Sequence, residues 1–401
     1  MLNNKDIQDI TTMIRTDMDF LRVFDCRCCG LCVSNWADEQ RCVISTYKTG
    51  NQINCRGVNS IMKNIIDGVI DYSEDINNVI WRCASCHLCI ERCELYVDPA
   101  VYIRKLRCEM VDRGIAPDSF KDVFKSIEKE GNVWNAPRAE RMDWAKGLDV
   151  PTVETNPDFE YLVFIGDASA YNPRNQKTAR AFVEILNKAG VNYAVLGDKE
   201  QTSGNEAFHM GEQLLFEDIA AENIALFKEY GVRKIVCLSA HGYDIIKNEY
   251  PNVDETFDAK VMHYTTLLRR LIKKKKITFS NELNKTITYH DPCYLGRHND
   301  EYDDPRYVIK SIPGVTFEEI PHVNQKIAVC CGGGGGGIFM RRGDGIPTEA
   351  IRYNQLKDTG ADIACVACPM CMQMFEGENE NAEQKIVIKD IAELVYENMD
   401  K

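Results

Sequence analysis

The feature that most constrains this chain is a set of five cysteines in its last third, spread over three short segments. They are Cys293, the adjacent Cys330 and Cys331, and the Cys-Pro-Met-Cys segment from Cys368 to Cys371. Thirty-six residues separate Cys293 from Cys330, and thirty-six separate Cys331 from Cys368. Because thiolates are soft ligands that suit iron, this layout predicts one large iron–sulfur centre gathered from three loops. A site with more thiolates than an ordinary four-cysteine site favours a centre that performs chemistry over one that only passes electrons on.

Composition places these cysteines in a reducing compartment. The 401-residue chain has 18 cysteines, but its N-terminus is polar and lacks the charged-then-apolar pattern of a signal peptide. No run approaches the roughly 18 apolar residues of a membrane span. We therefore expect a cytoplasmic protein, from an oxygen-poor host, that uses its cysteines for metal. A net charge of −13 argues against nucleic-acid binding, which needs a basic surface.

Six consecutive glycines, Gly332 to Gly337, follow the cysteine pair. Glycine lets the backbone approach a bulky cluster and point its N–H groups at sulfur. The same run formally satisfies the dinucleotide pattern G-x-G-x-x-G. However, neither an opening helix nor a ribose-binding acid is evident, so we expect no flavin or nicotinamide cofactor on this chain.

The N-terminal part contains a second cysteine pattern. The spacing C-x2-C-x2-C-x3-C over Cys83, Cys86, Cys89 and Cys93 is that of bacterial ferredoxins, although Glu94 replaces the usual following proline. In two-cluster ferredoxins the fourth cysteine of such a run serves the other cluster. The run therefore predicts cubane [4Fe–4S] binding with a partner run elsewhere.

An upstream run supplies that partner. Cys26, Cys29 and Cys32 share the spacing, but nine residues separate Cys32 from Cys42, which we interpret as an insertion over 33–41. The crossed assignment defines a first cubane site (Cys26, Cys29, Cys32 and Cys93) and a second cubane site (Cys83, Cys86, Cys89 and Cys42). Two spare cysteines, Cys28 and Cys55, compete with Cys42 for its place, and zinc is the alternative metal for such spacings. Between the runs, apolar residues from Ile61 to Ile70 repeat at helical spacing and predict a buried helix face.

The rest of the chain alternates short apolar strands with helices. Strands are expected at 161–165, 191–196, 234–238, near Thr286, 315–320 and 362–367, with helices between them. This pattern predicts an α/β architecture with largely parallel sheets behind a mostly helical N-terminal module. The domains we expect are a ferredoxin-like module (1–110), a linker (111–157), a first half (158–275) and a second half (276–401).

The two halves can be aligned as an internal repeat. Asp167 then falls where the second half has Cys293, and the segment 202–204 falls at the paired cysteines and the glycine after them. The segment 239–242, which contains His241, falls where the second half has 368–371, while Cys237 aligns with Val366. Every predicted ligand is replaced in the first half, which should therefore be metal-free and structural or should shape a cleft that His241 faces.

These residues resemble the cysteine-rich "CCG" family, and specifically the HdrD component of heterodisulfide reductase. The matching segments are both N-terminal runs, 290–297, the segment from Cys330 through the glycines, and 367–371. The resemblance implies a two-cubane ferredoxin-like module joined to a duplicated CCG domain. It also implies a noncubane [4Fe–4S] cluster on five ligands, which we call the C-terminal centre: Cys293, Cys330, Cys331, Cys368 and Cys371.

Two functions follow from the resemblance and the lost first motif. In the first, electrons pass through the cubanes to the C-terminal centre, which reduces or oxidises a disulfide or related sulfur substrate at Cys293, Cys330 and Cys331. His290 would then be the proton donor, although a histidine hydrogen-bonded at a strand end fits equally. In the second, the chain is an electron-transfer subunit between a flavoprotein and a quinone, ferredoxin or cytochrome. Both imply a multi-subunit complex, with a membrane subunit as a further partner, and a third reading is a zinc-stabilised scaffold.

Overall fold

The computed structural model describes residues 2–33, 42–46, 54–340 and 346–400. The chain divides into two compact units, each built from three chain segments. The first unit comprises Met1–Asp122, Glu206–Gln213 and His322–Arg352. The second comprises Val123–Asn205, Leu214–Pro321 and Tyr353–Lys401.

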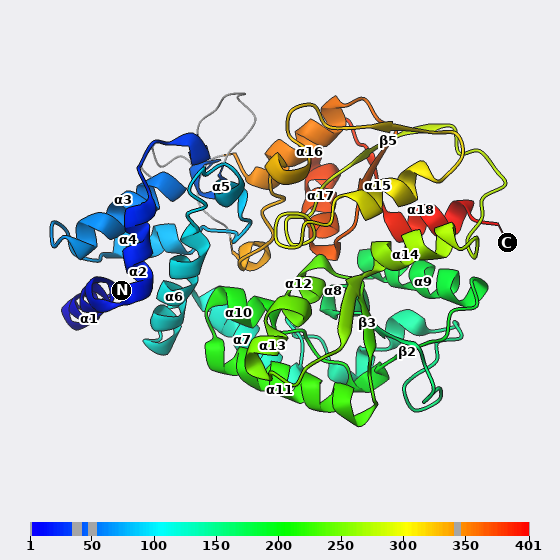
Figure 1. The fold of residues 1–401 in the computed structure, drawn as a ribbon, viewed down its shortest axis with the longest axis horizontal. Helices are drawn as coiled ribbons and strands as arrows, with labels where there is room; N and C mark the ends of the chain where they lie inside the picture. Colours follow the sequence, from blue (N-terminus) through cyan, green and yellow to red (C-terminus); the bar gives the residue numbers. More distant parts are fainter. Residues whose placement is uncertain (1, 34–41, 47–53, 341–345, 401) are drawn as a thin grey trace. The chain divides into compact units, whose positions relative to one another are not determined.

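The first unit is helical (Figure 1). Its helices, two of which continue into the second unit, are α1 (Asn4–Thr16), α2 (Met18–Leu21), α3 (Cys55–Ile66), α4 (Glu74–Ile80), α5 (Leu88–Glu91), α6 (Pro99–Asp112), α7 (Asp118–Glu130) and α10 (Asn205–Met210). Asn54 caps α3 by accepting a hydrogen bond from the N–H of Gly57, as its residue type favours. The helix predicted between the cysteine runs is therefore confirmed.

Part of that helical prediction was wrong. Met62 and Ile65 are buried, but Val69 and Ile70 are 69% and 39% exposed. The helix ends at Ile66, and Gly68 follows in the left-handed region, so the apolar spacing continues past the point where it describes one helix face.

The second unit contains two four-stranded sheets, and all of their strand pairs are parallel. The strand order is β2-β1-β3-β4 in one sheet and β6-β5-β7-β8 in the other. The strands are β1 (Tyr161–Phe164), β2 (Tyr193–Val195), β3 (Lys234–Cys237), β4 (Lys260–His263), β5 (Lys285–Tyr289), β6 (Val315–Glu318), β7 (Ile363–Val366) and β8 (Val387–Asp390). The duplicated α/β architecture predicted from the sequence is confirmed.

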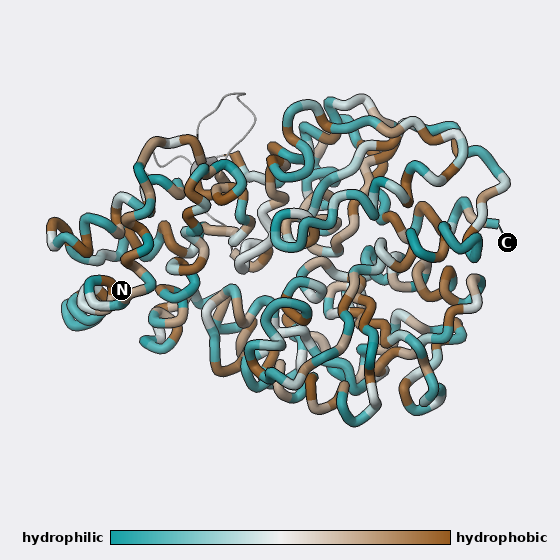
Figure 2. The backbone as a smooth tube through the Cα atoms, in the orientation of Figure 1, coloured by the Kyte–Doolittle hydropathy of each residue, from teal (hydrophilic) through white to brown (hydrophobic). Residues whose placement is uncertain are grey.

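Helices connect these strands, as parallel pairing requires. In the first half they are α8 (Asp167–Tyr171), α9 (Pro173–Lys188), α11 (Gln213–Glu229), α12 (Ala240–Asn248), α13 (Tyr250–Val253) and α14 (Tyr264–Lys273). In the second half they are α15 (Asp303–Lys310), α16 (Thr348–Asp358), α17 (Pro369–Asn381) and α18 (Ile391–Asn398). The central strands are hydrophobic (Figure 2), and Ile235, Val236, Ala364 and Cys365 are fully buried.

Two strands escaped sequence reasoning, β4 and β8. Both are four residues long and lie at the end of their sheet, where one side is unpaired. Lys260 begins β4 and is exposed, and Val387 begins β8 and is 52% exposed. Short edge strands lack the continuous apolar run that marks a central parallel strand.

The two halves pack with matched elements. Helix α9, which follows β1, packs on α18, which follows β8 (Figure 1). Correspondingly, α15, which follows β5, packs on α14, which follows β4. Arg174 at the start of α9 forms ion pairs with Glu376 (2.8 Å) and Glu393 (2.9 Å) of the second half. The repeat seen in the sequence is thus a repeat in packing.

Asp390 joins the halves as well. It caps α18 by accepting a hydrogen bond from the N–H of Ala392 (2.8 Å), and it accepts another from the hydroxyl of Tyr264 on α14 (2.7 Å). Burial raises the pKa of Asp390 to about 7, against the lowering effects of these hydrogen bonds and of Arg174. An acid whose pKa is higher in the folded state binds more protons there than in the unfolded chain.

Stability should therefore fall as pH rises through this window. Between about pH 4 and pH 7 the free energy of unfolding should drop by up to about 4 kcal/mol, since each unit of pKa shift corresponds to about 1.4 kcal/mol. Urea unfolding of anaerobically purified protein at several pH values measures this. In Asp390→Asn, which keeps a capping side chain, the slope should flatten; an unchanged slope would show that other groups set it.

Candidate metal centres

The two N-terminal cysteine runs fold into the same local loop. In the first run the N–H of Cys28 points at the sulfur of Cys26, at 3.3 Å. In the second run the N–H of Ser85 points at the sulfur of Cys83, at 3.4 Å. Backbone N–H groups directed at cysteine sulfur stabilise the thiolate form that binds iron.

The backbone angles of the loops match too. Cys28 and Gly30 have φ values of 52° and 84°, and Ser85 and His87, at the same positions of the second run, have 50° and 57°. Left-handed backbone at three non-glycine residues is uncommon, and such strain gathers at functional sites. Cys28 corresponds in position to Ser85, which argues that it is a loop residue rather than a ligand.

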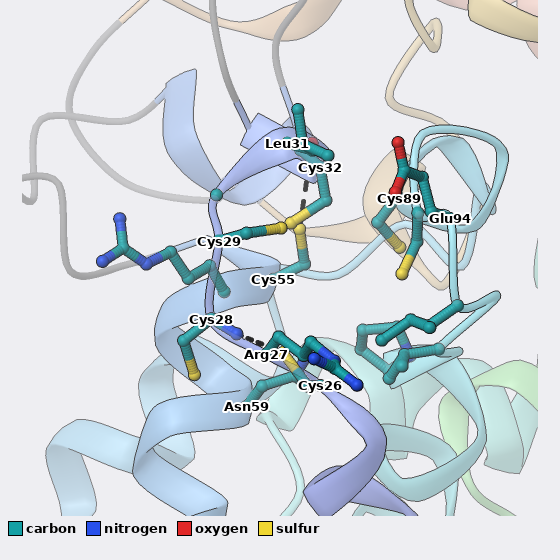
Figure 3. Close-up of a pocket in the computed structure, with 16 residues that line it drawn as sticks. Cys26, Arg27, Cys28, Cys29, Leu31, Cys32, Cys55, Asn59, Cys89 and Glu94 are labelled. Atoms are coloured by element: carbon teal, nitrogen blue, oxygen red, sulfur yellow. Dashed lines mark hydrogen bonds between the residues drawn. The ribbon is translucent and has the colours of Figure 1, made fainter.

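A cavity of about 320 Å³ lies beside the first run. Its lining includes all four cysteines of the first cubane site, together with Cys28, Cys55 and Cys89. In Figure 3 the sulfur atoms of Cys29, Cys32 and Cys55 point toward one another, whereas that of Cys28 points away. Cys93, which the crossed assignment placed with the upstream run, lines this cavity, and so does Cys89, which it placed in the second site.

The cysteines assigned to the second cubane site influence one another. Burial raises the pKa of the Cys83 thiol to about 12, Arg107 lowers it, and Cys86 and Cys42 raise it further. A hydrogen bond with Cys55 lowers the pKa of Cys89, but burial and the charges of Cys42 and Cys86 raise it overall. Thiols that resist ionisation in the absence of metal bind iron with release of their protons. Cys42 acts on two of its three proposed partners.

Cys55 lies between the two sites. Its thiol contacts the carbonyl oxygen of Cys32 at 4.0 Å (Figure 3), and hydrogen bonds with Cys32, Cys42 and Cys89 raise its pKa well above the usual value. It begins α3 and is 2% exposed. The fourth ligand of the second site thus has two candidates in place, Cys42 and Cys55. The inserted residues 34–41 lie outside the described residues.

The glycine-rich segment repeats the same device in the first unit. The N–H of Gly332 points at the sulfur of Cys330 at 3.3 Å, and Gly332 has φ 86°. The glycines then lead into a 3-10 turn, Gly337–Phe339, rather than an α-helix. The dinucleotide alternative required a helix at this point, so the local structure favours sulfur ligation instead.

Three cysteines of the C-terminal set belong to the second unit. Cys293 follows β5, and Cys368 follows β7, which pairs with β5. Cys368 is the N-cap of α17, Pro369 is its first residue, and Cys371 lies in its first turn. All three are buried, at 5%, 0% and 2% exposure. The carboxyl ends of adjacent parallel strands are where such α/β folds gather functional side chains.

His290 lies in the same loop as Cys293. It is 1% exposed, its ring packs edge-on against Phe375 at 4.8 Å, and one ring nitrogen lies within 4.8 Å of the Cys371 sulfur. Its backbone N–H extends the sheet by donating to the carbonyl of Cys365. The structure therefore brings His290 to Cys371. Cys330 and Cys331 lie on a chain segment of the first unit.

Strand registers confirm the alignment of the two halves. Leu162 pairs with Ile235 in the first sheet, and Thr288 pairs with Ala364 in the second. Asp167 lies five residues after Leu162, as Cys293 does after Thr288. Likewise Ser239 lies four residues after Ile235, as Cys368 does after Ala364.

In the first half the ligand positions carry structural contacts. Asp167 forms a buried ion pair with Arg141 at 2.9 Å, and Arg141 also pairs with Glu200 at 2.8 Å. Ser239 caps α12 by accepting from the N–H groups of His241 and Gly242. Carboxylate and hydroxyl oxygens in these roles are poor partners for a thiolate-bound iron cluster.

His241 nevertheless lies against the second half. Its ring contacts that of Tyr294, the residue after Cys293, with centroids 4.3 Å apart, and Tyr294 contacts His298 at 4.4 Å. His298 is 3.4 Å from Asp244 of the first half. His241, which we expected to face a cleft, thus contacts the residue that follows Cys293.

Of the cysteines outside these sets, Cys237 ends β3 and Cys365 lies in β7, and both are fully buried. Cys108 is half-buried, and the guanidinium of Arg104 contacts it at 3.5 Å. Sequence reasoning also missed Arg107, fully buried on α6, because nothing in a helix sequence distinguishes one buried arginine from a solvated one.

The donor set, the N–H groups at sulfur and the cysteine-lined cavity together fit iron–sulfur clusters. Comparison with known proteins agrees. The family model of the cysteine-rich domain (CCG) matches residues 163–241 and 287–376. The two matches fall within the two halves, 158–275 and 276–401, that the sequence repeat defines.

The chain is also similar to whole proteins. It is 35% identical to the probable iron-sulfur-binding oxidoreductase FadF of Bacillus subtilis, over 80% of this chain and 46% of that protein. It is 32% identical to the EtfAB:quinone oxidoreductase of Syntrophomonas wolfei, over 81% and 47%. It is 31% identical to HdrD of the dihydromethanophenazine:CoB–CoM heterodisulfide reductase of Methanosarcina mazei, over 81% and 79%.

The chain belongs to the CCG-domain family of iron–sulfur oxidoreductases that includes HdrD of heterodisulfide reductase. It spans about half the length of the first two relatives. In the described part of the chain, no helix has both the length and the apolar composition needed to cross a bilayer.

Serine substitutions identify the fourth ligand of the second cubane site. We expect Cys42→Ser to lower the iron content by about four per chain, since one cubane holds four irons. Cys28→Ser should keep its iron because Cys28 occupies the position of Ser85. Iron and acid-labile sulfide assays on anaerobically purified variants measure this. Loss of iron in Cys55→Ser with retention in Cys42→Ser would reverse the assignment.

Proposed function

We propose that this chain is a redox subunit that carries electrons from the two cubane sites to a C-terminal centre acting on a disulfide or related sulfur substrate. The first cubane site would use Cys26, Cys29, Cys32 and Cys93, and the second Cys83, Cys86, Cys89 and Cys42. Five ligands would hold a noncubane cluster: Cys293, Cys330, Cys331, Cys368 and Cys371. That cluster, when bound, would exchange electrons with the sulfur substrate.

The observation that carries this proposal is the contrast between the halves. At matched strand ends the second half presents buried cysteines, while the first presents Asp167 and Ser239 in structural contacts. A thiolate set retained on one half only is a specific arrangement rather than a general excess of cysteine. The proposed domains are 1–110, 111–157, 158–275 and 276–401, as the sequence suggested.

Protein side chains would supply the proton. Reduction of a disulfide needs protons as well as electrons, and His290 is proposed as the donor because its ring lies beside Cys371 and Phe375. The packing of Phe375 limits water around the ring. His241 is the control position. Its ring contacts that of Tyr294, the residue after Cys293.

A second function is an electron-transfer subunit between a flavoprotein and a quinone, ferredoxin or cytochrome. Two observations favour it. One relative is named as an EtfAB:quinone oxidoreductase, and the first half has no cysteine at its ligand positions. We therefore do not propose a mechanism that needs a noncubane cluster on each half. Any electron donor would be another chain.

The partners we propose follow from the same reasoning. They are flavoprotein or other redox subunits, and a disulfide or thiol substrate. A membrane subunit would join them where the acceptor is a lipid-soluble quinone, placing a cytoplasmic chain at the membrane through its partner. Nucleic acid is not a proposed partner, given the net charge of −13.

The first test is metal content and its response to substrate. Anaerobically purified protein should contain about twelve irons and as many labile sulfides, from three four-iron clusters. Added thiols or disulfides should change one electron-paramagnetic resonance (EPR) signal and leave the cubane signals as they were. A content of about eight irons per chain would contradict the C-terminal centre. An EPR spectrum that thiols and disulfides leave unchanged would favour the electron-transfer function.

The second test addresses His290. His290→Gln should keep the iron content and lower disulfide turnover roughly 100-fold, the lower range for loss of a general acid. His241→Gln, the matched control, should stay close to the wild-type rate. Steady-state turnover with an artificial electron donor measures both. Equal rates in the two variants would leave His290 with the structural role of a strand-end histidine.

A further inference from the structure

A buried arginine of the first unit connects two of the cysteine loops. Arg107 lies on α6 and has no exposed surface. One of its terminal nitrogens donates to the carbonyl oxygens of Ile80 (3.0 Å) and Cys83 (2.7 Å). The other donates to the carbonyl oxygens of His209 (2.7 Å) and Gly335 (3.2 Å).

These four carbonyls come from three separate chain segments. Cys83 begins the second ferredoxin-like run, and Gly335 lies four residues after Cys331. A single guanidinium thus bonds to the cubane loop on one side and to the glycine segment on the other. The planar fork of arginine has the several donors in fixed directions that such bridging needs.

The two loops also touch directly. A Cβ atom added at Gly335, where φ is 57°, would lie 2.5 Å from the carbonyl oxygen of Cys83 and 3.0 Å from the carbonyl carbon of Ala84. Both contacts are to backbone, which cannot rotate away. Glycine is therefore required for the close approach of the segment that follows Cys330 and Cys331 to the loop of Cys83.

The surroundings hold the guanidinium in place. Its central carbon lies 5.4 Å from the centre of the Trp81 ring, and Trp81 packs edge-on against Phe120 at 5.4 Å. Phe120 in turn lies directly against Gly336. Aromatic rings around a buried cation exclude water, so its charge acts over a longer distance than it would at the surface.

We propose that Arg107 is a positioning residue that clamps the second cubane loop to the Cys330–Cys331 segment and places a positive charge beside both. The inference rests on the proposed function, because it assumes clusters at both places. A nearby positive charge stabilises the more negative, reduced state of a cluster and raises its reduction potential.

Three variants separate the charge from the clamp. Arg107→Gln removes the charge and most of the donors. Arg107→Lys keeps the charge but lacks the fork that reaches both loops. Gly335→Ala keeps Arg107 and pushes the glycine segment away from Cys83. Arg104→Gln is the matched control, since Arg104 is on the same helix but contacts Phe208, Cys108 and Gln213 instead.

The measurement is a potentiometric titration followed by EPR, on full-length protein whose iron content has been determined. In Arg107→Gln we expect a lower potential for one cubane and a weaker spin–spin interaction between clusters. In Arg107→Lys and Gly335→Ala the interaction should weaken while the potential stays closer to wild type. Arg104→Gln should change neither quantity.

The proposal is overturned if Arg107→Gln, with wild-type iron content, keeps both the potential and the interaction. Should that variant fail to retain iron, Arg107→Lys and Gly335→Ala decide: an unchanged interaction in both overturns the clamp. A wild-type chain with only about eight irons would instead refute the C-terminal centre. The potential of the second cubane would then still test the charge of Arg107, so the two failures are distinguishable.

Discussion

The parallel pairing of central strands is the constraint on which the second unit depends. Because β5 and β7 pair in parallel, both strands end at the same edge of the sheet. Cys293 and Cys368 follow these two strand ends. The same pairing of β1 with β3 delivers Asp167 and Ser239 to the equivalent edge. The scaffold therefore determines where chemistry can occur, and the residue types at those strand ends determine whether it does.

The first half shows which contacts occupy the positions where the second half has cysteines. A buried polar side chain needs a partner, because an unpaired buried polar group is costly. Asp167 is paired with Arg141, which also forms an ion pair with Glu200. Glu200 in turn accepts hydrogen bonds from the backbone N–H groups of Ile165 and Gly166. This half also supplies α9 and Arg174, which hold the second half.

The cysteine loops of the first unit share one backbone turn, which directs an N–H group at a cysteine sulfur. A bound thiolate needs donors, and the nearest available are backbone N–H groups, which reach the sulfur only if the chain turns back on itself. At Cys28, Ser85 and Gly332 the chain does so through left-handed residues. That two of these are not glycine indicates that the turn is maintained at some conformational cost, about 1–3 kcal/mol per residue.

Much of this could be predicted because it depends on local pattern. Cysteine spacing identified both ferredoxin-like runs, alternation of strands and helices identified the α/β architecture, and the equal spacing of the halves identified the repeat. Predictions that extended a local pattern too far were wrong, as for Val69 and Ile70, where the helix had already ended. The edge strands β4 and β8 were missed for the opposite reason, since they are short and lack a continuous apolar run.

The sequence by itself determined which residues are available as ligands, because thiolate chemistry and short spacings survive in the primary structure. Only the tertiary structure decided which distant groups meet: His290 lies beside Cys371, and Arg107 lies between Cys83 and Gly335. Gly335 and Arg107 are 228 residues apart, and a contact of that kind has no counterpart in local periodicity. It exists because packing of the whole unit removes both groups from water, and each then requires a hydrogen-bond partner.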